Sequence, residues 1–234
     1  MSKNLLNLHK YLRNYFGPLR WWPGDSELEI MVGAILTQNT NWQNVSKAIC
    51  NLKAKKLLDV KPLYYIKEQS LSELIKPCGY HNLKAKRLKN FISFFYKEYA
   101  GSPEKMFSDE LYNLREKLLN INGVGPETAD SILLYAGGKP IFVVDAYTSR
   151  IFQRHQYFST EYKYRQIQDY FMDKLPRDSL IYNEFHAQIV MIGKKYCKKN
   201  NPECEDCPLF SFFEKTSLFH LQAEQYHKNK MVRS

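Results

Sequence analysis

Apolar residues recur at the three- and four-residue spacing of a helix face along most of the chain. Four clear stripes are Leu28, Met31, Val32, Ile35 and Leu36; Leu83, Leu88, Phe91, Ile92 and Phe95; Leu111, Leu114 and Leu118; and Ala129, Ile132, Leu133 and Ala136. Asp25 and Ser26 are candidate N-caps for the first stripe. Residues 146–155, 163–175 and 179–194 predict three further helices. The only strand-like run, residues 141–144, is too short to build a sheet alone, so we expect an all-α fold.

The composition is that of a folded chain with an excess of positive charge. Of the 234 residues 44% are hydrophobic, and 34 Lys and Arg outnumber 24 Asp and Glu, giving a net charge of +10. This excludes a disordered basic tail and is compatible with a polyanionic partner, although many ordinary proteins are equally basic. No apolar stretch is long enough for a membrane span. Five cysteines without a secretory signal favour a reducing, cytoplasmic setting.

The most informative segment, residues 118–150, predicts a helical hairpin. Gly123 and Gly125 allow a tight turn between two helices, and Pro126 suits the first position of the second helix. Such a turn leaves free backbone N–H groups at a helix N-terminus, and these groups can hold a phosphate. A plain helix-turn-helix connection would use the same glycines, so the turn alone leaves both interpretations open.

Asp145 adds candidate chemistry to this segment. It directly follows the apolar run Ile141 to Val144. A carboxylate in such surroundings is costly unless it caps a helix or takes part in a reaction. Asp145 precedes the predicted helix 146–155, so it is also a candidate N-cap, and the two roles are compatible.

The hairpin and its trailing aspartate resemble those of the endonuclease III superfamily of helix-hairpin-helix DNA glycosylases, and the resemblance covers residues 20–210. It implies a two-lobed all-α fold with a DNA-binding cleft between the lobes. Residues 25–137 would form a helical barrel domain that contains the hairpin, and residues 1–24 and 138–234 the second helical domain. The resemblance also implies that Gly123, Val124 and Gly125 bind the DNA backbone and that Asp145 is catalytic.

One position distinguishes two classes within this superfamily. Bifunctional members carry a lysine two residues after the second glycine of the turn, and that lysine forms a Schiff base with the sugar. Here the position is Glu127, which cannot form an imine. The resemblance therefore implies a monofunctional glycosylase in which water attacks C1′. Lys139 is a less suitable substitute because it lies beyond the second hairpin helix.

Two further segments are similar to the 3-methyladenine DNA glycosylase III branch, namely residues 21–23 and residues 36–42. By that resemblance Gln38 and Asn39 fill the gap in the duplex, and the base pocket is lined by Trp21, Trp22, Pro23 and Trp42. Electron-rich indoles suit a flipped, cationic N-alkylated purine. Packing in an ordinary core is the alternative for the tryptophans.

The segment from Cys78 to Arg87 resembles the superfamily's helix ahead of the hairpin. Gly79 predicts a turn, and Lys84, Lys86 and Arg87 are expected to meet DNA phosphates. A solvated helix face is the alternative for at least one of the three.

Three cysteines form a separate pattern near the end of the chain. Cys197, Cys204 and Cys207 match the first three positions of the Cys-x6-Cys-x2-Cys-x5-Cys pattern that binds a [4Fe–4S] cluster in the superfamily, but Phe213 stands at the fourth. A three-cysteine cluster, a zinc site completed by His220 or another group, and a segment without metal all stay open. In each case the segment would present four lysines to DNA, namely Lys194, Lys195, Lys198 and Lys199.

Together these features predict a monofunctional glycosylase for base excision repair. We expect it to act as a monomer on double-stranded DNA that carries a damaged base, and to excise alkylated purines of the 3-methyladenine type. The alternatives are an endonuclease III-like glycosylase with AP lyase activity, a mismatch glycosylase and a non-catalytic helix-hairpin-helix DNA-binding protein.

Overall fold

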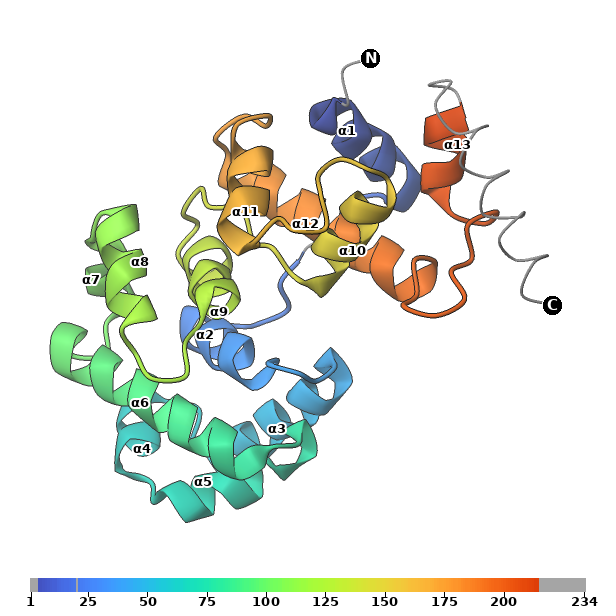
Figure 1. Ribbon diagram of the computed structural model, residues 1–234. Helices are drawn as coiled ribbons and strands as arrows, with labels where there is room; N and C mark the ends of the chain where they lie inside the picture. Colours follow the sequence, from blue (N-terminus) through green and yellow to red (C-terminus); the bar gives the residue numbers. More distant parts are fainter. Residues whose placement is uncertain (1–3, 20, 215–234) are drawn as a thin grey trace. The chain divides into compact units, whose positions relative to one another are not determined.

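The computed structural model describes residues 4–19 and 21–214. Within these ranges the chain forms helices joined by loops, without any β-strand (Figure 1). The predicted all-α fold is therefore confirmed. Residues 141–144 form a fully buried segment without regular secondary structure, because no second strand is present in the described ranges to pair with it. None of the helices described is long and apolar enough to cross a membrane.

The chain divides into two compact units, each assembled from separate stretches of sequence. The first, which we call the aspartate unit, comprises Met1–Leu19, Val144–Pro176 and Glu184–Ser234. The second, the hairpin unit, comprises Arg20–Val143 and Arg177–Asn183. Residues 138–143 and 177–183, which were expected in the second domain, belong to the hairpin unit. There Phe142 packs edge-on against Tyr182, with 5.6 Å between ring centroids.

The helical elements of the hairpin unit are α2 (Glu27–Leu36), α3 (Trp42–Ala54), α4 (Val60–Tyr65), α5 (Glu68–Leu74), the 3-10 turn η1 (Lys76–Cys78), α6 (His81–Tyr99), α7 (Pro103–Ser108), α8 (Leu111–Leu119), α9 (Pro126–Ser131) and the π-helical turn η2 (Ile132–Ala136). Helices α4 and α5 pack along α6 (Figure 1). The predicted stripe of α6 is buried from Leu88 to Phe95, whereas Leu83 in its first turn is 47% exposed and does not join the core.

Helix α2 is the central element of the hairpin unit. Ser26 begins it, because its side chain accepts a hydrogen bond from the Glu29 backbone N–H at 3.2 Å. Nearly every side chain of the helix is buried, including Met31 and Ile35, and the helix packs against α3, α6, α9 and η2. Each large apolar side chain that is fully buried contributes about 1.5–3 kcal/mol of hydrophobic stabilisation.

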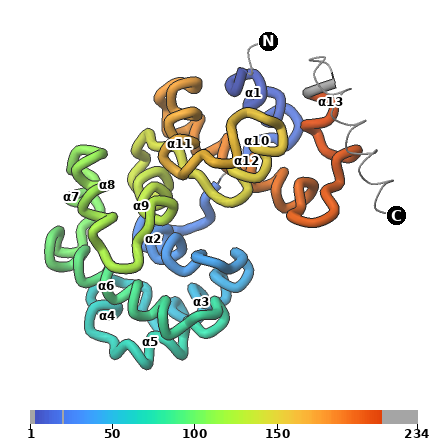
Figure 2. Tube along the Cα trace, viewed as in Figure 1, coloured from blue at the N-terminus to red at the C-terminus, as the bar shows by residue number. Residues whose placement is uncertain are grey.

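The helices of the aspartate unit are α1 (Leu5–Phe16), α10 (Ala146–Arg154), α11 (Tyr164–Met172), α12 (Ser179–Lys195), whose first residues belong to the hairpin unit, and α13 (Pro208–Glu214). The three predicted helices over 146–194 are confirmed. Phe152, Phe171 and Phe185 form the aromatic core, with ring centroids 4.7–6.3 Å apart. Helix α13 packs beside α1, so the two ends of the described chain lie together in this unit (Figures 1 and 2).

Candidate active site

The predicted hairpin is formed by α8, a tight turn and α9 (Figure 2). Gly123 has a φ of +98°, and a Cβ at this position would lie 2.2 Å from Cγ of Arg87. Only glycine fits there without strain. Gly125 caps α9, and no atom lies within 4 Å of the place where its Cβ would be, so its backbone is open on that side. Val124 is buried, and its backbone N–H donates to the Ile121 carbonyl at 3.0 Å, so this donor is used inside the turn and is not offered to a phosphate as predicted.

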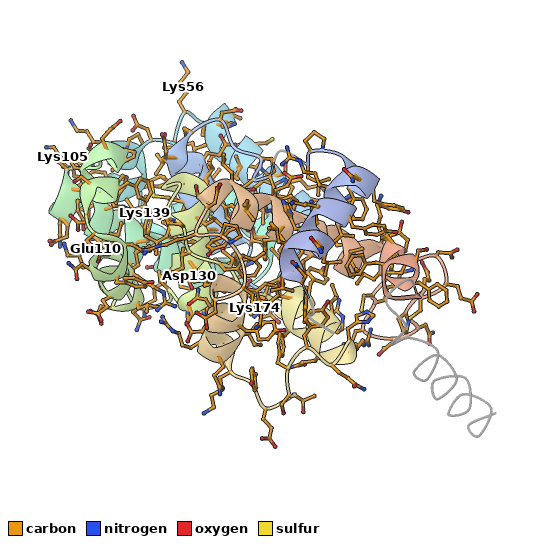
Figure 3. The ribbon with its side chains drawn as sticks, turned by 90° about the horizontal axis from the view of Figure 1, so that it is seen from above. Lys56, Lys105, Glu110, Asp130, Lys139 and Lys174 are labelled. Carbon is orange, nitrogen blue, oxygen red and sulfur yellow. The ribbon has the colours of Figure 1, made fainter. Side chains whose placement is uncertain are left out.

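An ion pair holds the two hairpin helices together. Arg115 of α8 donates from Nε to Oδ1 of Asp130 at 2.6 Å and from its terminal nitrogen to Oδ2 at 3.1 Å. Asp130, which is labelled in Figure 3, is fully buried in α9. A bidentate pair of this kind is geometrically demanding, so it fixes the angle at which α9 leaves the turn.

Gln38 joins the loop after α2 to the hairpin. Its Nε2 donates to the Gly123 carbonyl at 3.0 Å and to Oγ1 of Thr128 at 2.9 Å, while its Oε1 accepts from the Arg87 guanidinium. The neighbouring Asn39 is exposed, and its φ of +52° places it in the left-handed region. Of the two residues predicted to enter the duplex, Gln38 thus supports the hairpin turn, whereas Asn39 is open to solvent.

The basic residues of α6 have different surroundings. Lys84 is 1% exposed, its ammonium donates to the Cys78 carbonyl at 2.8 Å, and burial lowers its pKa. This corrects the prediction that Lys84 meets a phosphate, because its ammonium lies inside the fold. Lys86 is exposed. Lys89 lies on the same helix and donates to the carbonyls at the end of α4 and beyond, those of Leu63, Tyr64 and Ile66.

Three aromatic residues gather over α2. The Trp22 ring lies 5.2 Å from that of Trp42, nearly perpendicular to it, and 4.9 Å from that of Tyr135. Gly33 lies beneath the two indoles, and a Cβ there would approach both to 3.3 Å. We call Trp22, Trp42 and Tyr135 the aromatic cluster. The structure brings two of the predicted pocket tryptophans together and adds a tyrosine from η2.

The other predicted pocket residues flank this cluster. Trp21 packs edge-on against Trp22, with 6.0 Å between ring centroids, and Pro23 is exposed. The indole N–H of Trp22 is buried, and within the described residues it has no hydrogen-bond partner. A buried donor without a partner carries an energetic cost that a ligand with an acceptor can relieve.

Asp145 is the N-cap of α10, as its position in the sequence predicts. Its Oδ1 accepts hydrogen bonds from the backbone N–H of Thr148 at 2.7 Å and from the Thr148 hydroxyl at 2.8 Å. The carboxylate side chain is 13% exposed, and its Oδ2 lies 3.7 Å from Nε2 of His186. One oxygen of Asp145 is thus fixed by the helix terminus, and the other is not used by the cap.

The two positions considered for lyase chemistry, Glu127 and Lys139, have different surroundings. Glu127, at the position of the family lysine, is exposed in the first turn of α9. Lys139, labelled in Figure 3, donates from Nζ to the Asp109 carbonyl at 2.7 Å. That hydrogen bond would have to break before Lys139 could act as a nucleophile.

The metal site predicted at Cys197, Cys204 and Cys207 stays a prediction. Among the residues described, no group of three or more cysteine, histidine or acidic side chains is placed to share a metal ion. Phe213 occupies the fourth position of the pattern, and His220 lies outside the described residues. We call residues 197–207 the cysteine segment.

Two arginines of α10 bind the cysteine segment through hydrogen bonds. Arg150 donates to the carbonyls of Cys197 and Gly193, and Arg154 donates to Sγ of Cys197 at 3.2 Å and to two further carbonyls, those of Lys198 and Lys199. Lys198 is ion-paired with Glu203. The backbone of the segment is therefore anchored by guanidinium groups four residues apart on one helix face.

The model of the HhH-GPD superfamily of base excision DNA repair proteins matches residues 32–177, a range that contains the hairpin and Asp145. The chain belongs to this superfamily. Similar HhH-GPD relatives include a Methanocaldococcus jannaschii protein assigned as a DNA repair glycosylase, 47% identical over 209 residues that cover 89% of this chain and 94% of the relative. Endonuclease III of Thermotoga maritima is 28% identical over 183 residues, which cover 76% of this chain and 78% of the enzyme.

Solved structures of HhH-GPD proteins agree with this assignment. The 3-methyladenine DNA glycosylase of H. pylori, solved with 1,N6-ethenoadenine bound, is similar with a TM-score of 0.69 and 30% identity over 81% of this chain and 96% of the glycosylase. A non-covalent endonuclease III–DNA complex has a TM-score of 0.77 at 18% identity, covering 90% of this chain and 94% of the enzyme. At 18% identity, the likeness to endonuclease III shows only that the two proteins share a fold.

Some site residues of this HhH-GPD chain escaped the sequence analysis. Tyr135 was not among the predicted pocket residues, and Arg87 was expected to meet a DNA phosphate, whereas its guanidinium donates to Gln38. His186 lies 41 positions after Asp145 in a predicted helix, and the two meet only in the folded chain. No spacing rule connects these pairs, so the sequence offered no signal for them beyond the residue types.

Proposed function

We propose that the protein is a monofunctional DNA glycosylase that hydrolyses the N-glycosidic bond of alkylated purines of the 3-methyladenine type. The observation that carries the proposal is the Asp145 carboxylate, which is held at the N-terminus of α10 through Oδ1 while Oδ2 is left outside the cap. The similarity to a 3-methyladenine glycosylase over 96% of that structure supports the choice of substrate.

Asp145 supplies the charge that this reaction needs. Loss of a purine leaves an oxocarbenium-like sugar, and a fixed carboxylate stabilises the positive charge as it develops. The same carboxylate can orient and deprotonate the attacking water. An N-alkylated purine is already cationic and leaves readily, so the enzyme needs no acid to protonate the base.

The aromatic cluster selects the base that is excised. Stacking of a flipped base on an aromatic ring contributes about 1–3 kcal/mol, and a cationic base adds cation–π attraction to the indoles. The Trp22 N–H, which has no partner in the described part of the chain, offers a hydrogen bond to such a base. Extruding the base costs a few kcal/mol, which is least where the lesion already weakens pairing.

The hairpin supplies affinity for duplex DNA without reading its sequence. The open backbone at Gly125 and the exposed side chains of Asn39 and Lys86 are the proposed contacts. We propose further that the protein acts as a monomer in the cytoplasm. Because Glu127 replaces the lysine of bifunctional enzymes, the product is an intact abasic site.

A panel of lesion-containing duplexes tests this proposal. Duplexes with single 3-methyladenine, 7-methylguanine, thymine glycol and G·T sites are incubated with excess enzyme, and the released bases are separated and weighed by mass spectrometry. Release of the methylated purines alone supports the proposal. Release of thymine glycol or of the mismatched thymine instead would establish an endonuclease III-like or mismatch specificity.

Borohydride treatment in the same reactions tests the absence of lyase chemistry. A Schiff base between the enzyme and the sugar is reduced to a stable covalent complex that migrates slowly in a denaturing gel. The proposal predicts no such band. A trapped complex that disappears in Lys139→Gln would show that Lys139 takes the place of the missing hairpin lysine.

A further inference from the structure

A buried histidine lies behind the proposed catalytic carboxylate. His186 sits on the inner face of α12 in the aspartate unit and is 4% exposed. Its Nε2 lies 3.7 Å from Oδ2 of Asp145, the oxygen that the helix cap leaves unused. This separation is longer than a hydrogen bond, so the imidazole borders the carboxylate closely without a strong bond to it.

The surroundings of His186 keep its imidazole neutral at neutral pH. Its neighbours on α12 include buried apolar residues, and burial lowers the pKa of His186 while the negative charge of Asp145 opposes that shift. Other polar groups nearby in the unit have their own partners. Glu184 accepts from the Leu19 backbone N–H at 2.9 Å, and His9 of α1 pairs with Gln188 at 3.1 Å.

The protonation state of His186 therefore determines how much negative charge Asp145 presents. A neutral imidazole limits the movement of Oδ2 and leaves the carboxylate charge uncompensated. An imidazolium at the same place would form an ion pair with the carboxylate and cancel the charge that a cationic sugar needs. In this change the imidazole takes up one proton from solvent and forms one N–H bond, and no bond of the protein breaks.

We propose that His186 is a positioning residue for Asp145, which holds Oδ2 in place when neutral and switches the carboxylate off when protonated. The inference rests on the proposed role of Asp145 in the reaction. It assigns the loss of activity in acid to protonation of His186. The lowered pKa places that loss below the ordinary range of a histidine, near 6.5.

The coupling between the two groups can be tested without any activity. The ring signals of the six histidines are followed by NMR as a function of pH in the 234-residue chain, and the His186 signal is identified by its absence from His186→Gln. In Asp145→Asn the His186 titration should move to lower pH, because the charge that favours imidazolium is gone. An unchanged His186 titration in Asp145→Asn would overturn the proposal.

The functional consequence is tested by single-turnover base release from an N-methylated duplex between pH 4.5 and 8, values chosen to bracket the titration of a histidine at about 6.5. In His186→Gln the acid limb should move to lower pH, because the group that forms an ion pair with the carboxylate is gone, while duplex affinity is unchanged. His9→Gln is the matched control, since His9 is also buried with a lowered pKa but pairs with Gln188.

The two experiments separate the possible failures. An acid limb in His186→Gln equal to that of the wild type, or an equal shift in His9→Gln, would overturn the assignment to His186. If the wild type releases no base at any pH, the proposed function fails, while the NMR titration still decides whether His186 and Asp145 are coupled. That titration compares the wild type with Asp145→Asn. If His186→Gln does not fold, the His186 signal is assigned directly in the wild-type spectrum, and the comparison remains valid.

Discussion

Replacement of Gly123 by alanine tests whether the hairpin turn has the geometry described here. The φ of +98° at Gly123 is a conformation that alanine rarely adopts, and the added Cβ would lie 2.2 Å from Cγ of Arg87. Arg87 would have to move away, and its hydrogen bond to Gln38 would be lost. Gln38 would then be less firmly held against the Gly123 carbonyl and Thr128.

The size of the effect follows from these two contributions. A non-glycine residue held in a sparsely populated backbone region costs about 1–3 kcal/mol. A hydrogen bond to a charged group contributes about 1.5–3 kcal/mol, part of which Arg87 can recover by bonding to water. We therefore expect Gly123→Ala to lower the free energy of unfolding of the hairpin unit by about 2–5 kcal/mol.

Urea unfolding followed by tryptophan fluorescence measures this loss. All three tryptophans of the chain belong to the hairpin unit, so the signal reports on the unit that carries the substitution. Gly125→Ala is the matched control, because nothing lies within 4 Å of its Cβ position and its φ is −96°. Its unfolding free energy should stay within about 0.5 kcal/mol of the wild type. Equal stability of the two variants would refute the described geometry of the turn.

Three other predictions concern stability and metal content. Arg115→Met leaves the carboxylate of Asp130 buried without its bidentate partner and should lower the free energy of unfolding by about 3–5 kcal/mol in the same urea assay. Lys117→Met removes the exposed ion pair with Asp109 and should lower it by less than about 1 kcal/mol. Gly193→Ala would place a Cβ 2.2 Å from the Tyr147 ring, so the melting temperature should fall by several degrees; an unchanged value would show that α10 and α12 are not in close contact there. Elemental analysis of protein purified without oxygen decides the metal content of the cysteine segment: stoichiometric iron would support the three-cysteine cluster predicted from the sequence, zinc the alternative site, and neither metal a segment without metal.

The sequence predicted most of what a single helix can encode. Ser26 as a cap, the buried face of α6 from Leu88 to Phe95, and Asp145 at the start of α10 all follow from local spacing and residue type, and the structure confirms these placements. Leu83 fits the same spacing but lies in the first turn of α6, where it remains exposed. Periodicity therefore identifies a face, but it does not show how far along the helix that face is covered.

Such local patterns do not predict contacts between residues that are distant in the sequence. Lys84 lies between apolar positions on a basic helix, and nothing local shows that its ammonium turns inward to the Cys78 carbonyl. Arg87 and Gln38 are 49 residues apart, and His186 follows Asp145 by 41. Hydrogen bonds between elements depend on how helices pack, and one sequence carries no direct record of that packing.

Asp145→Asn separates the chemical role of the carboxylate from its structural role. Asparagine is as good an N-cap as aspartate, so its side-chain oxygen can still accept from Thr148, and α10 should remain intact. Asp145→Ala removes the cap as well and should cost a further 0.5–2 kcal/mol of stability, about the usual value for a lost cap. Asp206→Asn, which removes an exposed carboxylate from the same unit, is the matched control for net charge.

The most direct test of the account is the single-turnover rate at which wild type and Asp145→Asn release the base from the same 3-methyladenine duplex, with duplex affinity measured on the same preparations. We predict that the wild type and Asp206→Asn release free 3-methyladenine at equal rates. Asp145→Asn should be slower by at least about 100-fold, the cost of removing one preorganised charge from a transition state, with unchanged affinity for the duplex. Release by Asp145→Asn at the wild-type rate would contradict the central role assigned to this carboxylate.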